Sequence, residues 1–197
     1  HDIEYLNIQD EGGTNQIINK IYNKVIDELP KINSKERTKS ELSELTLALQ
    51  CGGSDSYSGI TANPALGFAS DLLVQYGGST ILSETPEIYG AEHLLIDRAL
   101  KESDIKKLIN QIKWWKNYTQ INGGSLDNNP SPGNKKGGLT TILEKSLGAV
   151  AKSGNSTMIN VLDYAEKISE KGFHFMDSPG YDPVSVTGQV ASGSNLI

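Results

Sequence analysis

Residues 47–68, LALQCGGSDSYSGITANPALGF, contain an apolar run that stops at Cys51, the single cysteine of this 197-residue chain. Two glycines and a serine–aspartate pair follow. After Pro64, apolar residues recur at the spacing of a helix. A buried strand, a polar loop and a helix in this order are typical of a β–α unit. The stretch therefore predicts a strand that ends at Cys51 and delivers it into a loop.

The same succession of strand and helix recurs along the chain. Strands are expected at residues 45–50, 79–84 and 172–177, with a further one at residues 3–9. Helices are expected at residues 14–29, 63–76, 85–100, 103–115, 141–154 and 161–169, and a last one begins near residue 184. Strands separated by helices predict an α/β layered sheet with parallel strands. Residues 122–138, rich in Gly, Asn and Pro, are expected to form the longest loop.

Composition limits the classes of function. The chain has 24 acidic and 18 basic residues, a net charge of -6 and a pI near 5.1, which argues against a nucleic-acid-binding surface. No apolar run is long enough for a transmembrane helix, and no segment has the pattern of a secretory leader. One cysteine excludes an internal disulfide and fits a reducing compartment. We expect a cytoplasmic protein that binds neither nucleic acid nor membrane.

Acidic side chains gather at the expected carboxyl ends of the strands, where ligands bind in open α/β sheets. Asp55 lies in the loop after Cys51, Glu84 ends the next strand with Glu87 three residues on, and Asp177 ends the last strand. A thiolate with several carboxylates combines soft and hard donors and suits a divalent metal such as Fe(II), Mn(II) or Zn(II). These five residues are therefore the predicted metal ligands.

Each of these residues also has a structural interpretation. Cys51 is equally compatible with a small packed side chain at a strand end. A nucleophilic Cys51 would need a histidine base nearby. His93 falls at a helix start and His174 alternates with phenylalanines inside a strand, so neither forms a persuasive dyad. Asp55 and Glu87 suit turn or helix-cap positions as well.

Two polar loops are candidates for holding an acidic substrate. Gly52 and Gly53 expose backbone N–H groups next to the Ser54 hydroxyl, an arrangement that suits a carboxylate or phosphate. The loop lacks the spacing of dinucleotide and P-loop motifs. Residues 122–138 contain Lys135, which either belongs to a solvated loop or sits on a lid that closes over an acidic substrate.

Four long segments together resemble the altronate dehydratase / galactarate dehydratase family, and most closely its altronate branch. They are residues 49–67 (LQCGGSDSYSGITANPALG), 81–95 (ILSETPEIYGAEHLL), 129–154 (NPSPGNKKGGLTTILEKSLGAVAKSG) and 171–197 (KGFHFMDSPGYDPVSVTGQVASGSNLI). The resemblance implies a Rossmann-like parallel sheet with helices on both faces, truncated relative to the full family domain. It divides the chain into a leading strand–helix unit at 1–44 and a metal and substrate domain at 45–197.

The resemblance also implies an activity. Members of the family are hydro-lyases that dehydrate sugar acids, such as D-altronate to 2-keto-3-deoxy-D-gluconate in hexuronate breakdown; galactarate and sulfolactate are alternative substrates. They are associated with Fe(II), with Mn(II) or Zn(II) as alternatives. Full chains carry an N-terminal β-rich domain and a further C-terminal part, so we expect this fragment to be inactive alone and the protein to form a homo-oligomer.

Dehydration of an aldonate requires a base for the weakly acidic α-hydrogen and a cation beside the carboxylate. Lys135, in the segment SPGNK, is the first candidate for the base and His93 the second, while the neighbouring Asn134 is expected to bind substrate. Two other classes stay open. A sugar-acid-binding module without activity would have its carboxylates away from the Cys51 loop, and a metal-independent thiol hydrolase would have a histidine beside Cys51.

Overall fold

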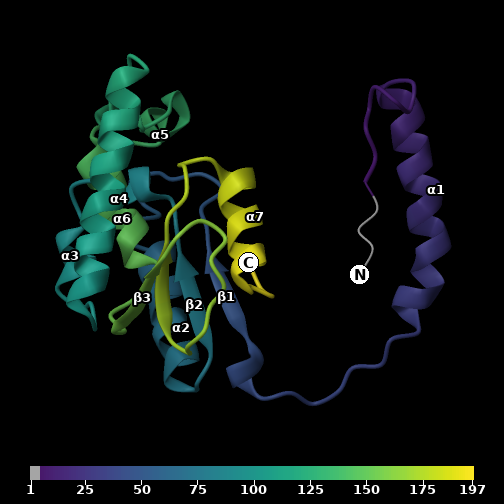
Figure 1. Cartoon of the computed structure of the whole chain (residues 1–197), viewed down its shortest axis with the longest axis horizontal. Coiled ribbons are helices and arrows are strands. Elements are labelled where there is room, and N and C mark those ends of the chain that lie inside the picture. Colours follow the sequence, from purple (N-terminus) through teal and green to yellow (C-terminus); the bar gives the residue numbers. More distant parts are fainter. Residues whose placement is uncertain (1–4) are drawn as a thin grey trace. The chain divides into compact units, whose positions relative to one another are not determined.

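The computed structural model describes residues 5–197 and divides the chain into two compact units. The first ends at Ser40 and the second comprises Glu41–Ile197. Figure 1 shows both units, coloured along the sequence. Each unit is described by itself, and the second one contains the whole sheet.

The first unit is built around one helix, α1, which spans Thr14–Asn33. The helix begins after Gly13, which has a φ of 107°, and continues past Pro30, where the sequence predicted its end. Pro30 lies in the last turn, so its missing N–H removes only one hydrogen bond of the helix. The strand expected at residues 3–9 was wrong for residues 5–9, which form no strand, and its first residues lie outside the described part of the chain.

The second unit is a four-stranded, all-parallel sheet in the order β1-β2-β4-β3. The strands are β1 (Thr46–Leu49), β2 (Ser79–Leu82), β3 (Met158–Leu162) and β4 (Phe173–Met176). The α-helices are α2 (Ala62–Gln75), α3 (His93–Ile96), α4 (Glu102–Ile121), α5 (Pro132–Lys136), α6 (Ile142–Ala151) and α7 (Asp182–Ser192). Three short 3-10 helices are η1 (Leu42–Glu44), η2 (Thr85–Ile88) and η3 (Leu126–Asn128). The α/β class and the three expected parallel strands are confirmed.

Three expectations about local structure were wrong. The single helix expected at residues 85–100 is instead the 3-10 helix η2 followed by the four-residue helix α3. The helix predicted at residues 161–169 is absent, because Val161 and Leu162 belong to β3, which pairs with β4 and buries both side chains. A short apolar run that is buried in a sheet cannot be distinguished from a buried helix by periodicity. Residues 122–138 contain η3 and α5, and α5 starts with a capping box between Ser131 and Asn134.

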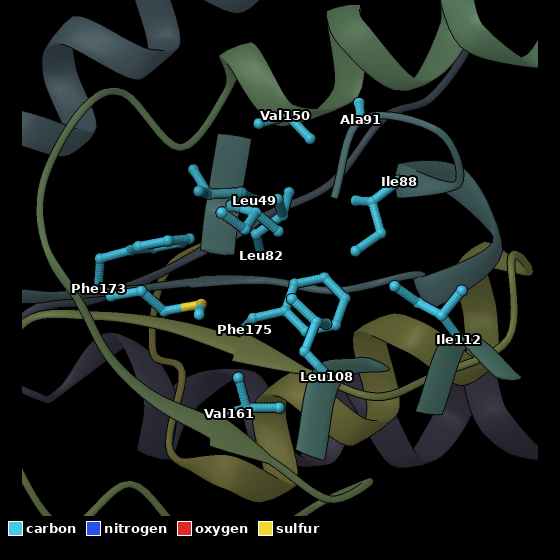
Figure 2. Packing of buried hydrophobic residues seen from close by; sticks show 12 residues of the cluster. Leu49, Leu82, Ile88, Ala91, Leu108, Ile112, Val150, Val161, Phe173 and Phe175 are labelled. Atoms are coloured by element: carbon cyan, nitrogen blue, oxygen red, sulfur yellow. The ribbon is translucent and has the colours of Figure 1, made fainter. Parts of the chain in front are cut away.

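Helices cover both faces of the sheet. On one face, Leu49, Leu82, Phe173 and Phe175 form the main core with side chains from the elements between β2 and β3, as Figure 2 shows. These partners are Ile88, Ala91, Leu95, Leu108, Ile112 and Val150. On the other face α7 covers a smaller cluster, and its Ser192 hydroxyl lies 3.2 Å from the sulfur of Met176. Burial on both sides places the accessible groups at the strand ends.

The two longest helices, α1 and α4, each have 20 residues. Both carry charged residues along their length. Among the helices of residues 5–197, none combines the length and the apolar character needed to cross a membrane.

A close approach between α2 and the end of α6 depends on Gly67. A Cβ atom at this position would collide with the carbonyl oxygen of Ala151 and lie 2.9 Å from the nitrogen of Gly154. Helix α2 follows directly on the loop that begins at Cys51. The glycine therefore fixes the position of the helix that anchors this loop.

We predict that Gly67→Ala destabilises the protein although alanine favours a helix more than glycine does. The backbone contact cannot relax without moving α2 from α6, so the free energy of unfolding should fall by about 2–3 kcal/mol. Urea denaturation followed by circular dichroism measures the change. Gly133→Ala is the control, because its Cβ would meet no atom closer than 3.6 Å. Equal stability of the two variants would contradict the prediction.

Candidate metal and substrate site

Three acidic side chains meet at the carboxyl edge of the sheet. Cys51 follows β1, Glu84 follows β2, and Asp182 is the first residue of α7. One ligand atom from each, the thiol sulfur and two carboxylate oxygens, lies within 4.8 Å of the other two. The parallel register of β1 and β2 brings the first two residues together, since both strands end at the same edge.

Glu84 has the least favourable environment of the three. Its side chain is buried, with the residue only 3% exposed, and its Oε1 atom has no hydrogen-bond partner among the described residues. Burial, and next the charge of Glu87, raise the pKa of Glu84 from 4.5 to about 8. A hydrogen bond from Gln50 and the charge of Lys152 act in the opposite direction. A buried acid with an unpartnered oxygen is typical of a functional position.

The backbone of Glu84 is strained as well. Its φ of 71° lies in the left-handed region, which costs a non-glycine residue roughly 1–2 kcal/mol. The loop after β4 holds it there: the Glu84 N–H donates to the hydroxyl of Ser178 at 2.9 Å, and the Thr85 N–H donates to the Ser178 carbonyl at 3.1 Å. These bonds direct the carboxylate into the cluster at the expense of backbone energy.

A buried ion pair lies directly beside the cluster. The Lys145 ammonium is 2.7 Å from Oε1 of Glu87, and each side chain is only 7% exposed. The other carboxylate oxygen of Glu87 lies 3.7 Å from the sulfur of Cys51. Lys145 also donates to the side-chain oxygen of Asn129 at 2.7 Å. The pair thus connects α6 to the thiol and to the segment before α5.

These surroundings favour the protonated thiol when no cation is bound. Burial, and next the charge of Glu87, raise the pKa of Cys51 above its usual value of 9.0. Lys152 and Ser54 lower the pKa, while Glu84 adds to the increase. A divalent metal would reverse the balance, because a coordinating thiol is deprotonated.

Of the five predicted ligands, Glu87, Asp55 and Asp177 lie outside the three-residue cluster, and Glu87 is instead the ion-pair partner of Lys145. Asp55 accepts the Ser58 N–H at 2.7 Å and closes a turn in the Cys51 loop. Asp177 accepts the indole N–H of Trp115 at 2.7 Å and the Thr85 hydroxyl at 2.5 Å. Both carboxylates therefore hold loops at the sheet edge in this structure.

The predicted substrate-binding residues lie in two loops that are joined to each other. Asn134 is buried and donates from its side chain to the Ser54 carbonyl at 2.9 Å. Gly52 and Gly53 have no neighbour within 4 Å of where a Cβ would stand. The start of α5 is thus attached to the Cys51 loop, and the two glycines leave its backbone open.

The two candidate bases are exposed. His93 begins α3, and Lys135 lies in the last turn of α5. Within residues 5–197, neither side chain makes a hydrogen bond or an ion pair in this structure. His174 is fully buried in β4, where its Nε2 lies 3.1 Å from the Glu170 carbonyl, so the expectation that it is a packing residue is confirmed.

Two hollows border the Cys51 loop. One of about 570 Å³ is lined by residues that include Gln50, Cys51 and Asp182. The other, of about 350 Å³, is lined by polar groups of the loop and by Lys145. Both have the size range of small-molecule sites, so the cluster and the ion pair are each next to space for a ligand.

Sequence reasoning missed Asp182, Lys145 and Lys152. Asp182 had a signal, because it precedes a proline at a helix start just after a strand. The two lysines had none, since lysines are almost always exposed: Lys145 lies within α6, and Lys152 follows the last residue of that helix.

Comparisons with known proteins point to one family. Residues 42–197 match the family described as "D-galactarate/Altronate dehydratase, C-terminal". The chain is 42% identical over 190 residues to galactarate dehydratase (L-threo-forming) of Escherichia coli, an alignment that covers 95% of this chain and 36% of the relative. It is 41% identical over 166 residues to altronate dehydratase of E. coli, covering 84% of this chain and 34% of the relative.

A third relative is named as a sulfo-lyase and not as a dehydratase. The chain is 35% identical over 164 residues to the (2R)-sulfolactate sulfo-lyase subunit beta of Chromohalobacter salexigens. That alignment covers 80% of this chain and 41% of the relative. The chain thus spans about a third of the length of the dehydratases that it matches.

We predict that Glu84→Gln stabilises the metal-free protein more as the pH rises. The unfolded carboxyl ionises near pH 4.5, whereas the folded one keeps its proton until about pH 8. Wild-type stability that is present below pH 4.5 is therefore lost as the pH rises to 8, by up to a few kcal/mol. Urea denaturation in chelator at both pH values measures it. Glu36→Gln, at an exposed position, should show no such trend. A difference in stability between Glu84→Gln and the wild type that does not change with pH would be evidence against the buried acid.

We predict that substitutions of the two ion-pair partners change the reactivity of the Cys51 thiol in opposite directions. Glu87→Gln should lower the pKa of Cys51 and speed its alkylation by iodoacetamide about tenfold near pH 8, because a negative charge beside the sulfur is lost. Lys145→Met should slow it, since Glu87 then lacks its counter-ion. With one cysteine in the chain, the rate reports on Cys51 alone. A change in the same direction in both variants would refute this account.

Proposed function

The chain belongs to the D-galactarate/altronate dehydratase family, and we propose that it carries the metal and substrate residues of a hydro-lyase that dehydrates D-altronate. The relatives named above are lyases of two kinds, sugar-acid dehydratases and a sulfo-lyase. The proposal rests most on one observation: the family match includes the strained, buried Glu84 together with Cys51 and Asp182.

The donor set fits a divalent metal. Glu84 presents a buried oxygen without a partner, Cys51 a soft sulfur and Asp182 a hard, exposed oxygen. This combination suits Fe(II), which we favour, and also Mn(II) or Zn(II). When bound, such an ion supplies positive charge that stabilises the enediolate formed from the substrate carboxylate. Cys51, Glu84 and Asp182 are the residues that would hold it.

The surrounding residues position the donors and the substrate. The Glu87–Lys145 pair holds one side of the thiol, and the Ser178 bonds fix Glu84. In the reaction a base takes the α-proton, the bond to the β-hydroxyl breaks, and the hydroxyl leaves with a proton as water. The enol then tautomerises to the 2-keto product.

Lys135 remains our first candidate for the base. The short helix that carries it is attached to the Cys51 loop through the hydrogen bond from Asn134 to the Ser54 carbonyl. His93 is the second candidate, although it begins a different helix. Removal of the proton requires a neutral base, which a closed, desolvated site favours for lysine.

Galactarate is the second candidate substrate. The match to the galactarate enzyme covers more of this chain than the match to the altronate enzyme, at nearly equal identity. Both acids have a carboxylate next to a hydroxyl-bearing carbon, so the same cluster would serve either. Sulfolactate is less favoured, because that relative is 35% identical.

We predict that Cys51→Ser and Asp182→Asn each weaken Fe(II) binding at least tenfold and reduce dehydration in parallel. Excess Fe(II) should restore part of the activity, since the loss is one of affinity. Activity is measured in the full-length protein with D-altronate, galactarate and sulfolactate, under reducing conditions. Metal content is measured separately.

Asp97→Asn is the matched control, because Asp97 is exposed and is not one of the three clustered residues. It should leave both quantities unchanged. Full metal stoichiometry and affinity in both Cys51→Ser and Asp182→Asn would contradict the metal assignment. Dehydration of none of the three acids by the metal-loaded protein would contradict the hydro-lyase itself.

A further inference from the structure

A third and larger hollow lies at the carboxyl ends of β3 and β4. Its volume is about 760 Å³, compared with about 570 Å³ and 350 Å³ for the two hollows beside the Cys51 loop. It is lined by α4, by residues 163–164 after β3 and by residues 177–179 after β4. Cys51, Glu84 and Asp182 are not among the described residues that line it. The hollow is therefore a separate space at the edge where open α/β sheets bind ligands.

Three aromatic rings of its wall are held in place by their neighbours. The indole N–H of Trp115 donates to Asp177 at 2.7 Å, and the hydroxyl of Tyr164 donates to a backbone carbonyl of α7 at 2.9 Å. The ring of Trp114 stacks on Tyr118, with centroids 5.1 Å apart and 9° between the planes, yet Trp114 is still 54% exposed. Rings fixed in this way offer stacking surfaces to a flat ligand.

One buried acceptor of this wall has no partner. Gln111 lines the hollow and is only 8% exposed, and its Nε2 lies 3.2 Å from the Leu162 carbonyl oxygen and 3.4 Å from Oδ1 of Asp163. Because both neighbours accept hydrogen bonds, the amide nitrogen must face them and the amide oxygen must face away. Within residues 5–197, this Oε1 has no hydrogen-bond partner. A buried acceptor without a donor is unfavourable, so a ligand that donates to it gains affinity.

The lysines of the wall, in contrast, already have counter-ions. The Lys107 ammonium lies 3.2 Å from Asp163 and 3.0 Å from Glu166. The Lys106 ammonium lies 2.8 Å from Glu102. An acidic ligand would have to compete with these carboxylates, whereas a neutral donor would meet the free oxygen of Gln111. The hollow therefore favours a neutral ligand that has a flat face and an N–H or O–H donor.

We infer that this hollow binds a planar heteroaromatic ring that carries an amino group, which is the chemistry of adenine. The faces of the ring stack on the fixed aromatic side chains, and the amino group donates to Oε1 of Gln111. A sugar ring fits less well, because each of its hydroxyl groups needs a polar partner. The site shares no residue with the metal cluster, although Ser178 in its wall accepts the Glu84 N–H at 2.9 Å.

The first test uses the unaltered 197-residue chain. Its two tryptophans, Trp114 and Trp115, both line the hollow, so intrinsic fluorescence reports on this space. Adenosine should quench the fluorescence to saturation, and methyl galactoside should leave it unchanged. Purine riboside, which has the same rings and ribose but no amino group, should bind at least about tenfold more weakly. The titrations are made in chelator, so they do not depend on the proposed metal.

The second test asks whether Gln111 recognises the amino group. Gln111→Met keeps the length of the side chain and removes the acceptor, so adenosine should bind at least about tenfold more weakly while purine riboside binds as before. The Leu162 carbonyl keeps the Asp177 N–H as a donor at 3.0 Å. Thermal melting establishes that the variant is folded. Gln120→Met, the same change at an exposed position of α4, is the matched control and should alter neither affinity.

The outcomes are distinct from those for the metal site. No quenching at millimolar adenosine, or equal affinities for adenosine and purine riboside, would overturn the inference. Quenching by methyl galactoside in place of adenosine would overturn it too, because the space would then accept a sugar. A folded Gln111→Met variant that still prefers adenosine would exclude the proposed contact. Metal binding is measured separately with the variants of Cys51 and Asp182, and it can fail while this site stands.

Discussion

The buried ion pair between Glu87 and Lys145 connects the parts of the molecule that form the site. It joins η2, which follows β2, to α6, and its carboxylate reaches the sulfur of Cys51 after β1. A buried pair contributes little net stability, because desolvation offsets the attraction, but loss of one partner leaves an uncompensated charge. The pair therefore contributes more to the choice among arrangements of the strand-end loops than to the stability of the protein.

The site is formed at an energetic cost. Glu84 is in a left-handed conformation, and its carboxyl group is buried beside another carboxylate. Each of these features destabilises the folded state, and proteins usually tolerate such costs where function requires them. The apolar core on the α4 and α6 side of the sheet supplies the compensating stability (Figure 2).

The protonation state of the donors relates to the proposed metal site. The raised pKa values of Cys51 and Glu84 keep these two donors protonated when no cation is near, and Asp182 adds an exposed carboxylate. In a low-dielectric interior, unpaired charges of either sign are unfavourable. A divalent metal would stabilise the ionised forms of these donors, which links the proposed reaction to their state in the unliganded site.

Much of the architecture followed from the sequence alone. Alternation of apolar strands and amphipathic helices predicted the parallel sheet, and the position of Cys51 at a strand end placed it at the edge where ligands bind, because these patterns depend only on local periodicity. β3 was missed for the same reason: its run is apolar on both faces, and only pairing with β4 distinguishes it from a helix.

The composition of the site was decided by tertiary structure. The sequence could not show that Asp182 joins Cys51 and Glu84 while Asp55 and Asp177 bind their own loops, because the distances depend on how α7 and the strand-end loops pack. Nor could it distinguish the buried Lys145 and Lys152 from exposed lysines, since burial is a property of the packed surface that surrounds a side chain and not of the residue itself.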